Sequence, residues 1–201
     1  MSHESSSKLL INNQTFIAFS GLMYMDKKKS LLLLTAVAAG TTLYNLLKPV
    51  KSNVAVVQGF QKEKFLGEWF EIARMDFRWE KNLKNVSASY ALNNDGSIRV
   101  NNQGFDMIKE RYKQSIGKAK FVRNEEEGAL KVSFFGPFYS GYNVVMIDDD
   151  YRYALVFGEN LDYMWMLSRD RIMPEDIKEK YLAYAKRSGY TTDKLVWTIQ
   201  E

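Results

Sequence analysis

Residues 69–168 contain eight short segments in which apolar and polar side chains alternate, each separated from the next by turn-forming residues. Alternation with a period of two is typical of a strand that buries one face and exposes the other. The segments are 69–74, 86–92, 98–103, 114–122, 129–135, 142–147, 153–158 and 163–168. Polar turns such as Asn93-Asn94-Asp95-Gly96 favour antiparallel hairpins between them. We therefore expect an all-β fold with eight antiparallel strands.

A helix is predicted after these strands. Pro174 stands at its start with Glu175 and Asp176 in the first turn, and Ser188-Gly189 ends it. Residues 195–199 then predict a short final strand. Eight strands and one late helix fit an up-and-down barrel, which removes its own edges. The pattern alone also allows a sandwich of two sheets.

The positive charge of the chain is concentrated before the predicted strands. Residues 1–53 hold six of the 28 basic residues and two of the 24 acidic ones, which leaves 22 of each in residues 54–201. The pI near 9.0 therefore describes an extension at 1–53 and not the barrel domain predicted at 54–201. A nucleic-acid partner would need a basic face on the folded part, so we expect none.

The residue types that are missing exclude much chemistry. The chain has no cysteine, and its single histidine is His3. Cysteine nucleophiles, disulfides, Cys/His zinc sites and a histidine base in the domain are therefore excluded. No spacing of carboxylates indicates a metal site. We expect no metal, no cofactor and no enzymatic activity.

A basic and then apolar segment precedes the domain. Asp26-Lys27-Lys28-Lys29-Ser30 leads into an apolar run at about 31–47, with Met25 as a plausible start of translation. This order is typical of a secretory signal, and Ala36-Val37-Ala38 offers a cleavage site. The run is also about as long as a short membrane-spanning helix. We favour an uncleaved hydrophobic helix as an anchor over cleavage; both place the barrel outside the cytoplasm.

Three motifs stand in a fixed order along the chain. Gly67-Glu68-Trp69 opens the first strand, Asp148-Asp149-Asp150-Tyr151 forms a later turn, and Arg169 ends the eighth strand. Together they resemble the signature regions of the lipocalins. The amino-acid sequences of 67–74, 131–139 and 141–145 are similar to those of bacterial outer-membrane lipocalins, which are related to apolipoprotein D. The resemblance covers roughly residues 54–201 and favours the barrel over the sandwich.

The resemblance also implies roles for the signature residues. Trp69 would fill the closed end of the barrel, Arg169 would stack on it, and Gly67 would allow a close approach of the backbone. These three would be structural. Bacterial lipocalins of this kind resemble lipoproteins whose lipobox ends in an acylated cysteine. Here Val37-Ala38-Ala39-Gly40 has glycine in that place, so lipidation on cysteine is excluded.

Strand parity predicts the side chains that line the interior. If Trp69 points inward, so do Glu71 and Ala73. Matching to the lipocalin strands then gives a largely apolar set of ligand-binding candidates: Glu71, Ala88, Tyr90, Val100, Asn102, Phe134, Tyr142, Val144, Val156, Tyr163 and Trp165. We expect a cavity for a long acyl chain, while a barrel filled by its own side chains is the alternative. For Glu71 we favour pairing with an arginine or tyrosine across the barrel over contact with a ligand headgroup.

The connections at one end of the expected barrel are apolar. They are predicted at 75–85, 104–113, 136–140 and 159–162, and carry the rim candidates Phe77, Trp79, Phe105, Met107, Phe138 and Tyr139. Exposed apolar clusters usually mark contact surfaces. We expect this end to be the entrance for a lipid.

These observations predict a protein that binds and stores or transports lipids such as fatty acids or lysophospholipids in the bacterial cell envelope. Its partners would be a lipid ligand and a membrane, and the sequence leaves open whether it forms a homodimer. Two alternatives are a non-binding envelope scaffold with a filled barrel and a lipocalin-like enzyme with Glu71 as its base.

Overall fold

The computed structural model describes residues 54–77 and 80–201. The strands are β1 (Gly67–Met75), β2 (Leu83–Leu92), β3 (Ile98–Asp106), β4 (Arg111–Phe121), β5 (Ala129–Phe135), β6 (Phe138–Ile147), β7 (Tyr153–Phe157), β8 (Met164–Ser168) and β9 (Leu195–Trp197). The helices are α3 (Lys62–Phe65), α4 (Glu175–Arg187) and the 3₁₀ turn η1 (Thr192–Lys194). The barrel belongs to one compact unit, Pro49–Glu201. The anchor predicted at 31–47 lies outside the described residues.

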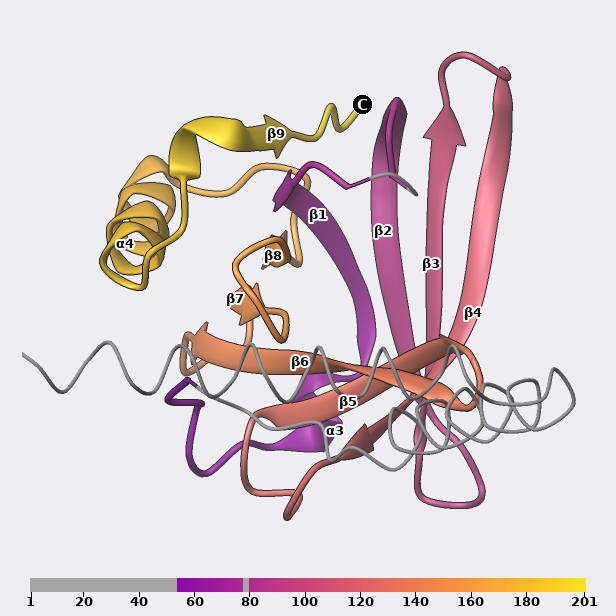
Figure 1. The fold of residues 1–201 in the computed structure, drawn as a ribbon, viewed down its shortest axis with the longest axis vertical. Helices are drawn as coiled ribbons and strands as arrows, with labels where there is room; N and C mark the ends of the chain where they lie inside the picture. The colour runs from indigo at the N-terminus through magenta and orange to yellow at the C-terminus, as the bar shows by residue number, and fades with distance from the viewer. Residues whose placement is uncertain (1–53, 78–79) are drawn as a thin grey trace, which may run out of the picture. The chain divides into compact units, whose positions relative to one another are not determined.

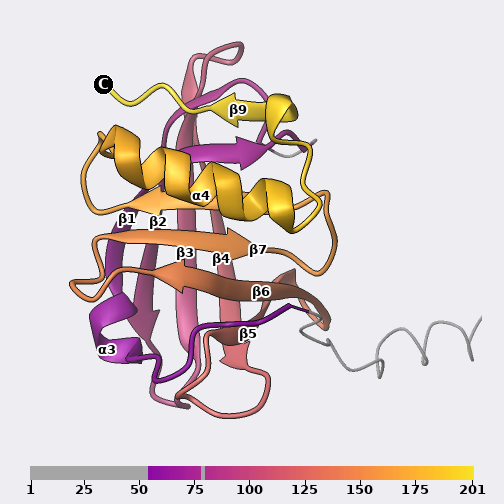
Figure 2. The same cartoon turned by 90° about the vertical axis from the view of Figure 1, so that its left-hand side faces the viewer.

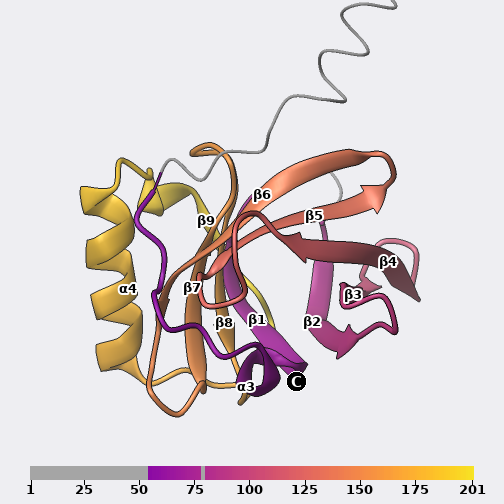
Figure 3. The ribbon, with the colours of Figure 1, turned by 90° about the horizontal axis from the view of Figure 1, so that it is seen from below.

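The strands form a closed antiparallel barrel. Consecutive strands pair from β2 through β8, and β8 pairs with β1. A further pairing of β1 with β2 closes the ring, with Trp69 opposite Ala88. Seen from below, the strands surround the interior in the order β2 to β4, then β5 and β6, then β7, β8 and β1 (Figure 3). The predicted barrel is confirmed, and the sandwich is not formed.

α4 covers the outer face of the barrel beside β7, β8 and β1 (Figures 1 and 2). Tyr181 and Ala185 of α4 are buried there against Leu155, Phe157 and Met164. A second cluster fills part of the barrel interior and includes Trp69, Val144 and Val156. The barrel therefore has an inner core and an outer core under the helix. Among residues 54–77 and 80–201, no helix has the length and apolar character needed to cross a membrane.

The two ends of the barrel differ. At one end, α3 and the preceding segment lie across the opening, and Phe60 and Phe65 are buried with Tyr151 in the inner core. The polar turns at 93–97 and 148–152 belong to this closed end. The other end is the open end. It is bounded by the connections 107–110, 136–137 and 158–163 and by the described parts of the connection between β1 and β2, 76–77 and 80–82.

Several strands extend further toward the open end than the sequence predicted. β6 begins at Phe138, directly after a two-residue turn, so Phe138 and Tyr139 belong to a strand and not to a loop at 136–140. β3 likewise includes Phe105. The loop predictions at 104–113 and 136–140 were therefore too wide.

Candidate functional site

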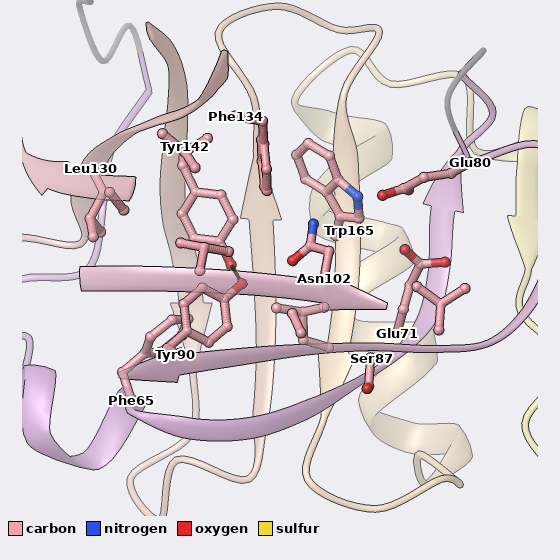
Figure 4. Close-up of a pocket in the computed structure, with 16 residues that line it drawn as sticks. Phe65, Glu71, Glu80, Ser87, Tyr90, Asn102, Leu130, Phe134, Tyr142 and Trp165 are labelled. Carbon is pink, nitrogen blue, oxygen red and sulfur yellow. Dashed lines mark hydrogen bonds between the residues drawn. The ribbon is translucent and has the colours of Figure 1, made fainter. Parts of the chain in front are cut away.

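The barrel encloses a cavity of about 60 Å³ whose wall receives side chains from β1 to β6 and from β8 (Figure 4). Most side chains of its wall are apolar or aromatic. The lining residues are Phe65, Glu71, Glu80, Val86, Ser87, Ala88, Tyr90, Val100, Asn102, Ala119, Leu130, Val132, Phe134, Tyr142, Trp165 and Leu167. Phe65 belongs to the closed end, and Glu80 to the open end.

Most ligand-binding candidates from the sequence meet at this cavity. They come from six strands, as expected if one face of each strand points into the barrel. The candidates in the wall are Glu71, Ala88, Tyr90, Val100, Asn102, Phe134, Tyr142 and Trp165. That they bind a ligand stays a prediction.

Three candidates do not line the cavity. Val144 and Val156 are fully buried in the inner core and do not belong to the cavity wall. Tyr163 lies just before β8 and is about one-third exposed. Its ring packs against Phe77 and Trp165 at the open end. It therefore lies further toward the open end than the cavity wall, beside Trp165, and that it binds a ligand stays a prediction.

The expectation that Ala73 points inward was wrong. A β-bulge lies between Glu71 and Ala73 in the pairing of β1 with β8. The extra residue reverses the parity of the strand beyond it. Ala73 consequently packs in the outer core under α4, while Arg74 is 1% exposed and turned toward Glu71.

Glu71 and Arg74 form a buried ion pair near the open end. Nη1 of Arg74 donates a hydrogen bond to Oε1 of Glu71 at 2.7 Å. Thr198 also donates from Oγ1 to this carboxylate oxygen at 2.5 Å. Arg74 further donates to the backbone oxygen of Glu80 at 2.5 Å. The pairing of Glu71 with an arginine is confirmed, although the partner comes from the same strand and not from across the barrel.

A second carboxylate adjoins this pair. Oε2 of Glu80 lies 3.5 Å from Nε of Arg74, and one arginine therefore serves two buried acids. Burial and the neighbouring charge of Glu71 raise the pKa of Glu80 to about 8, against the opposing effect of Arg74. Figure 4 shows both carboxylates beside the indole ring of Trp165. At neutral pH Glu80 therefore keeps its proton.

The raised pKa of Glu80 predicts a pH-dependent stability. Between about pH 4.5 and pH 8 the folded protein keeps a proton that the unfolded chain has lost. The free energy of unfolding should therefore fall as the pH rises through this window, by up to about 1.4 kcal/mol per pH unit from this group. Urea unfolding at pH 5.5, 6.5 and 7.5 should show this slope in the wild type and a flatter one in Glu80→Gln. Glu179→Gln, exposed on α4, should keep the wild-type slope; parallel curves for wild type and Glu80→Gln would contradict the assignment.

Two tyrosines form a polar contact deeper in the cavity. The hydroxyl groups of Tyr90 and Tyr142 are 2.7 Å apart and hydrogen-bonded to each other. Their burial raises the pKa of both phenols, so both stay neutral. Ser87 also accepts a hydrogen bond from Gln103 at 3.2 Å. These groups satisfy one another within the wall.

The signature residues lie at the closed end. Trp69 is fully buried, and the guanidinium carbon of Arg169 lies 3.9 Å from the centroid of its ring system. This is the stacking expected from the sequence. Arg169 also donates to the backbone oxygens of Lys64 at 2.7 Å and Leu66 at 2.8 Å. It thereby ties the segment around α3 to the end of β8.

Gly67 stands where a side chain would not fit. Its φ is +92°, a value that L side chains rarely adopt, and an added Cβ would lie 3.3 Å from Nη1 of Arg169. The close approach expected at this corner is therefore made to the arginine. Gly67, Trp69 and Arg169 do not line the cavity, whereas the neighbouring Phe65 does.

The rim candidates fall into three groups. Phe77 lies at the open end against Tyr163 and Trp165, and Met107 and Phe138 are exposed. The rings of Phe105 and Tyr139 instead pack on strand neighbours, namely Tyr112 and Lys131. Trp79 lies outside the described residues. The exposed side chains Ile108 and Phe135 also belong to this end and were not among the candidates.

Sequence reasoning missed several members of the wall and the arginine beside it, Arg74. Leu130 and Leu167 follow the same parity as Val132 and Trp165, so a longer count along each strand would have found them. Arg74 is displaced by the bulge, and Glu80 lies in a connection, where no periodicity gives the direction of a side chain. Within the described ranges, no group of three or more His, Cys, Asp or Glu side chains could hold a metal ion.

Comparison with known proteins agrees with this architecture. A family model described as a lipocalin-like domain matches residues 60–200. The outer membrane lipoprotein Blc of Citrobacter freundii is 46% identical over 147 residues, which are 73% of this chain and 83% of that protein. The protein of the same name from Vibrio cholerae is 39% identical and covers 80% of this chain and 95% of its own length. The chain belongs to the lipocalin family.

Solved structures show the same fold at lower identity. The cockroach allergen Per a 4 superposes with a TM-score of 0.60 at 18% identity, covering 77% of this chain and 97% of its own. This likeness supports the barrel alone.

Proposed function

We propose that this protein binds single-chain lipids, such as fatty acids or lysophospholipids, in its barrel and stores or transports them in the bacterial cell envelope. The observation that carries the proposal is the cavity inside the closed barrel, walled mainly by apolar and aromatic side chains. Each methylene group moved from water into such a wall contributes about 0.8 kcal/mol. Binding would therefore be driven by the chain and oriented by the polar groups.

Entry of a long chain requires side chains at the open end to move. The cavity of about 60 Å³ is smaller than the ~300 Å³ at which ligand pockets usually begin. Phe134 lines the cavity yet is 42% exposed, so its ring can turn toward solvent without disturbing the core. We propose Phe134 as the side chain that makes room for the ligand.

Two features support a place in the cell envelope. The similar bacterial proteins are named outer membrane lipoproteins, and the segment at 31–47 has the character of a signal or anchor. The chain contains no cysteine, so we propose attachment through this segment and not through acylated cysteine. The exposed Ile108 and Phe135 at the open end suit contact with a lipid surface, from which a ligand would enter.

Binding accounts for the site better than catalysis. The carboxylate of Glu71, the base that an enzyme would need here, is held by Arg74 and Thr198. This carboxylate is therefore already engaged by two neighbouring side chains. The alternative function, a non-binding scaffold, would require a barrel that its own side chains fill completely.

Filling the cavity should abolish binding. Ala88 lines the cavity and Ala91 is exposed on the same strand, so Ala88→Phe and Ala91→Phe make a matched pair. With the uncharged fluorescent probe N-phenyl-1-naphthylamine, we expect at least tenfold weaker binding in Ala88→Phe and wild-type binding in Ala91→Phe. Lysophospholipids or fatty acids should displace the probe from the wild type. Equal binding by both variants would show that the probe lies elsewhere, and a wild type that binds neither probe nor lipid would favour the scaffold.

A further inference from the structure

Large apolar side chains are exposed along one side of the barrel, on β4 and on the hairpin of β5 and β6. Tyr112 is 67% exposed, and Ile116 of the same strand is exposed as well. Phe135, 81% exposed, pairs with the exposed Phe138 where the hairpin turns. Both elements reach the side of the molecule opposite α4 (Figures 1 and 3). Exposed apolar clusters usually mark contact surfaces, so this side is a candidate interface.

Strand pairing is interrupted on this side. β4 pairs with β5 over Lys118–Phe121, whereas its stretch 111–117 pairs with β3 alone among the described strands. Phe134 of β5 lines the cavity and is partly exposed. Its ring lies against the end of this stretch, because a Cβ added to Gly117 would lie 2.8 Å from it. The side chain of Phe134 therefore stands between the cavity and solvent at the place where the pairing of β4 with β5 stops.

Four cations lie on the outer face of the same strands. Residues that alternate with the cavity-lining positions of β3, β4 and β5 point outward, and the basic ones among them are Arg99, Lys118, Lys120 and Lys131. Arg99 stands opposite Lys118, and Lys120 stands opposite Lys131. Of these cations, only Lys118 has a carboxylate partner among the described residues, namely Asp95 at 3.0 Å. Two pairs of like charges thus face each other across neighbouring strands.

This arrangement indicates an anionic partner. Like charges directly opposite each other destabilise a sheet, and a partner with negative charge would offset both repulsions. Lysines that only protect a free strand edge would stand on that edge, but Lys118 and Lys120 lie in the paired part of β4. Surfaces that lie on anionic bilayers combine cations, which meet the phosphates, with apolar side chains, which enter the boundary of the acyl chains.

We propose that this side of the barrel, the β4 face, docks on a bilayer that contains anionic lipids, and that a lipid chain passes from the bilayer into the cavity between β4 and β5, beside Phe134. The apolar members of the β4 face are Tyr112, Ile116, Phe135 and Phe138, and its basic members are the four cations named above. The inference rests on the proposed lipid-binding function and adds to it the membrane partner and the route of entry.

A single fluorescent label tests the docking in the full-length protein, because the chain has no cysteine of its own. Ile116→Cys places a label on the β4 face, and Glu179→Cys places it on the exposed side of α4. In vesicles of phosphatidylcholine with about one-third phosphatidylglycerol, a lipid with a nitroxide near its headgroup should quench the label at 116 about threefold or more strongly than the label at 179. In vesicles of phosphatidylcholine alone, both labels should be quenched alike.

Paired charge variants separate the β4 face from general attraction to the vesicle. Lys118→Gln with Lys120→Gln should remove the stronger quenching at 116, and so should high salt, which screens the attraction. Lys180→Gln with Lys186→Gln removes the same charge from exposed positions of α4 and should keep it. Equal quenching at 116 and 179 in anionic vesicles, or quenching that the β4 variant leaves unchanged, would overturn the inference. Self-quenching between labels at 116 without quenching by the nitroxide lipid would identify a second copy of the chain as the occupant and would also overturn it.

The rate of loading tests the route of entry. A monoacylglycerol with bromine at mid-chain is added to the vesicles that hold the protein, and quenching of Trp165 in the cavity wall is followed in time. We expect loading about threefold or more slowly in Lys118→Gln with Lys120→Gln than in the wild type, with the same final extent. Equal rates would overturn the inference and leave lipid binding intact, whereas no quenching of the wild type at any time would count against the proposed function.

Discussion

Trp69→Ala is expected to lower the free energy of unfolding by about 3–5 kcal/mol. The side chain is fully buried at the closed end, contacts Phe65, and lies beneath the guanidinium of Arg169. Its removal leaves a cavity that the surrounding strands cannot fill. It also removes the hydrogen bond that the indole N–H donates to the backbone oxygen of Phe65 at 2.8 Å. Urea unfolding gives the measurement.

Trp197→Ala is the matched control for this substitution. Trp197 lies in β9 and is 48% exposed, so its loss should cost about 1 kcal/mol or less. The folded fraction of Trp69→Ala should still bind lipid, because Trp69 does not line the cavity. Similar losses of stability in the two variants would contradict a special role of the closed end.

Arg74→Met should lower the free energy of unfolding by about 3–5 kcal/mol, as much as Trp69→Ala, because it leaves a buried carboxylate without its cation. Glu71 is 3% exposed and has no other charged partner of opposite sign among the described residues. The double variant Arg74→Met with Glu71→Gln removes both charges and should recover most of the loss. Unfolding free energies of the four proteins form a double-mutant cycle.

The cycle distinguishes charge pairing from simple packing. If Arg74 acts mainly through its aliphatic stem, methionine replaces most of that volume and the single substitution costs little. If it acts through charge, the two substitutions are strongly non-additive. Additive effects within about 0.5 kcal/mol would contradict the buried ion pair.

The sequence predicted the frame of the molecule because its regular parts repeat. Alternation located eight strands, and the stacking of Arg169 on Trp69 was implied by the resemblance to the lipocalins. Eight of the 16 residues of the cavity wall followed from parity, since residues such as Tyr90, Asn102 and Trp165 lie on regular stretches of strand. The strands and this half of the wall need only that one residue follows another at a fixed spacing.

The inferences that failed depend on breaks in that spacing. The bulge after Glu71 moves Ala73 outward and Arg74 inward, and a single sequence carries no clear mark of it. Glu80 reaches the cavity from a connection, where parity has no meaning. The polar groups at the open end of the cavity were consequently the part of the site that the sequence could not predict.

The central claim is that a lipid chain lies inside the barrel, and collisional quenching of tryptophan tests it directly. Trp165 lines the cavity, whereas Trp197 lies on the outer strand β9. A monoacylglycerol with bromine at mid-chain should quench the fluorescence of the full-length protein saturably, at one lipid per barrel. Most of this quenching should disappear in Trp165→Phe and persist in Trp197→Phe. Quenching that stays the same in Trp165→Phe, or that never saturates, would contradict the account.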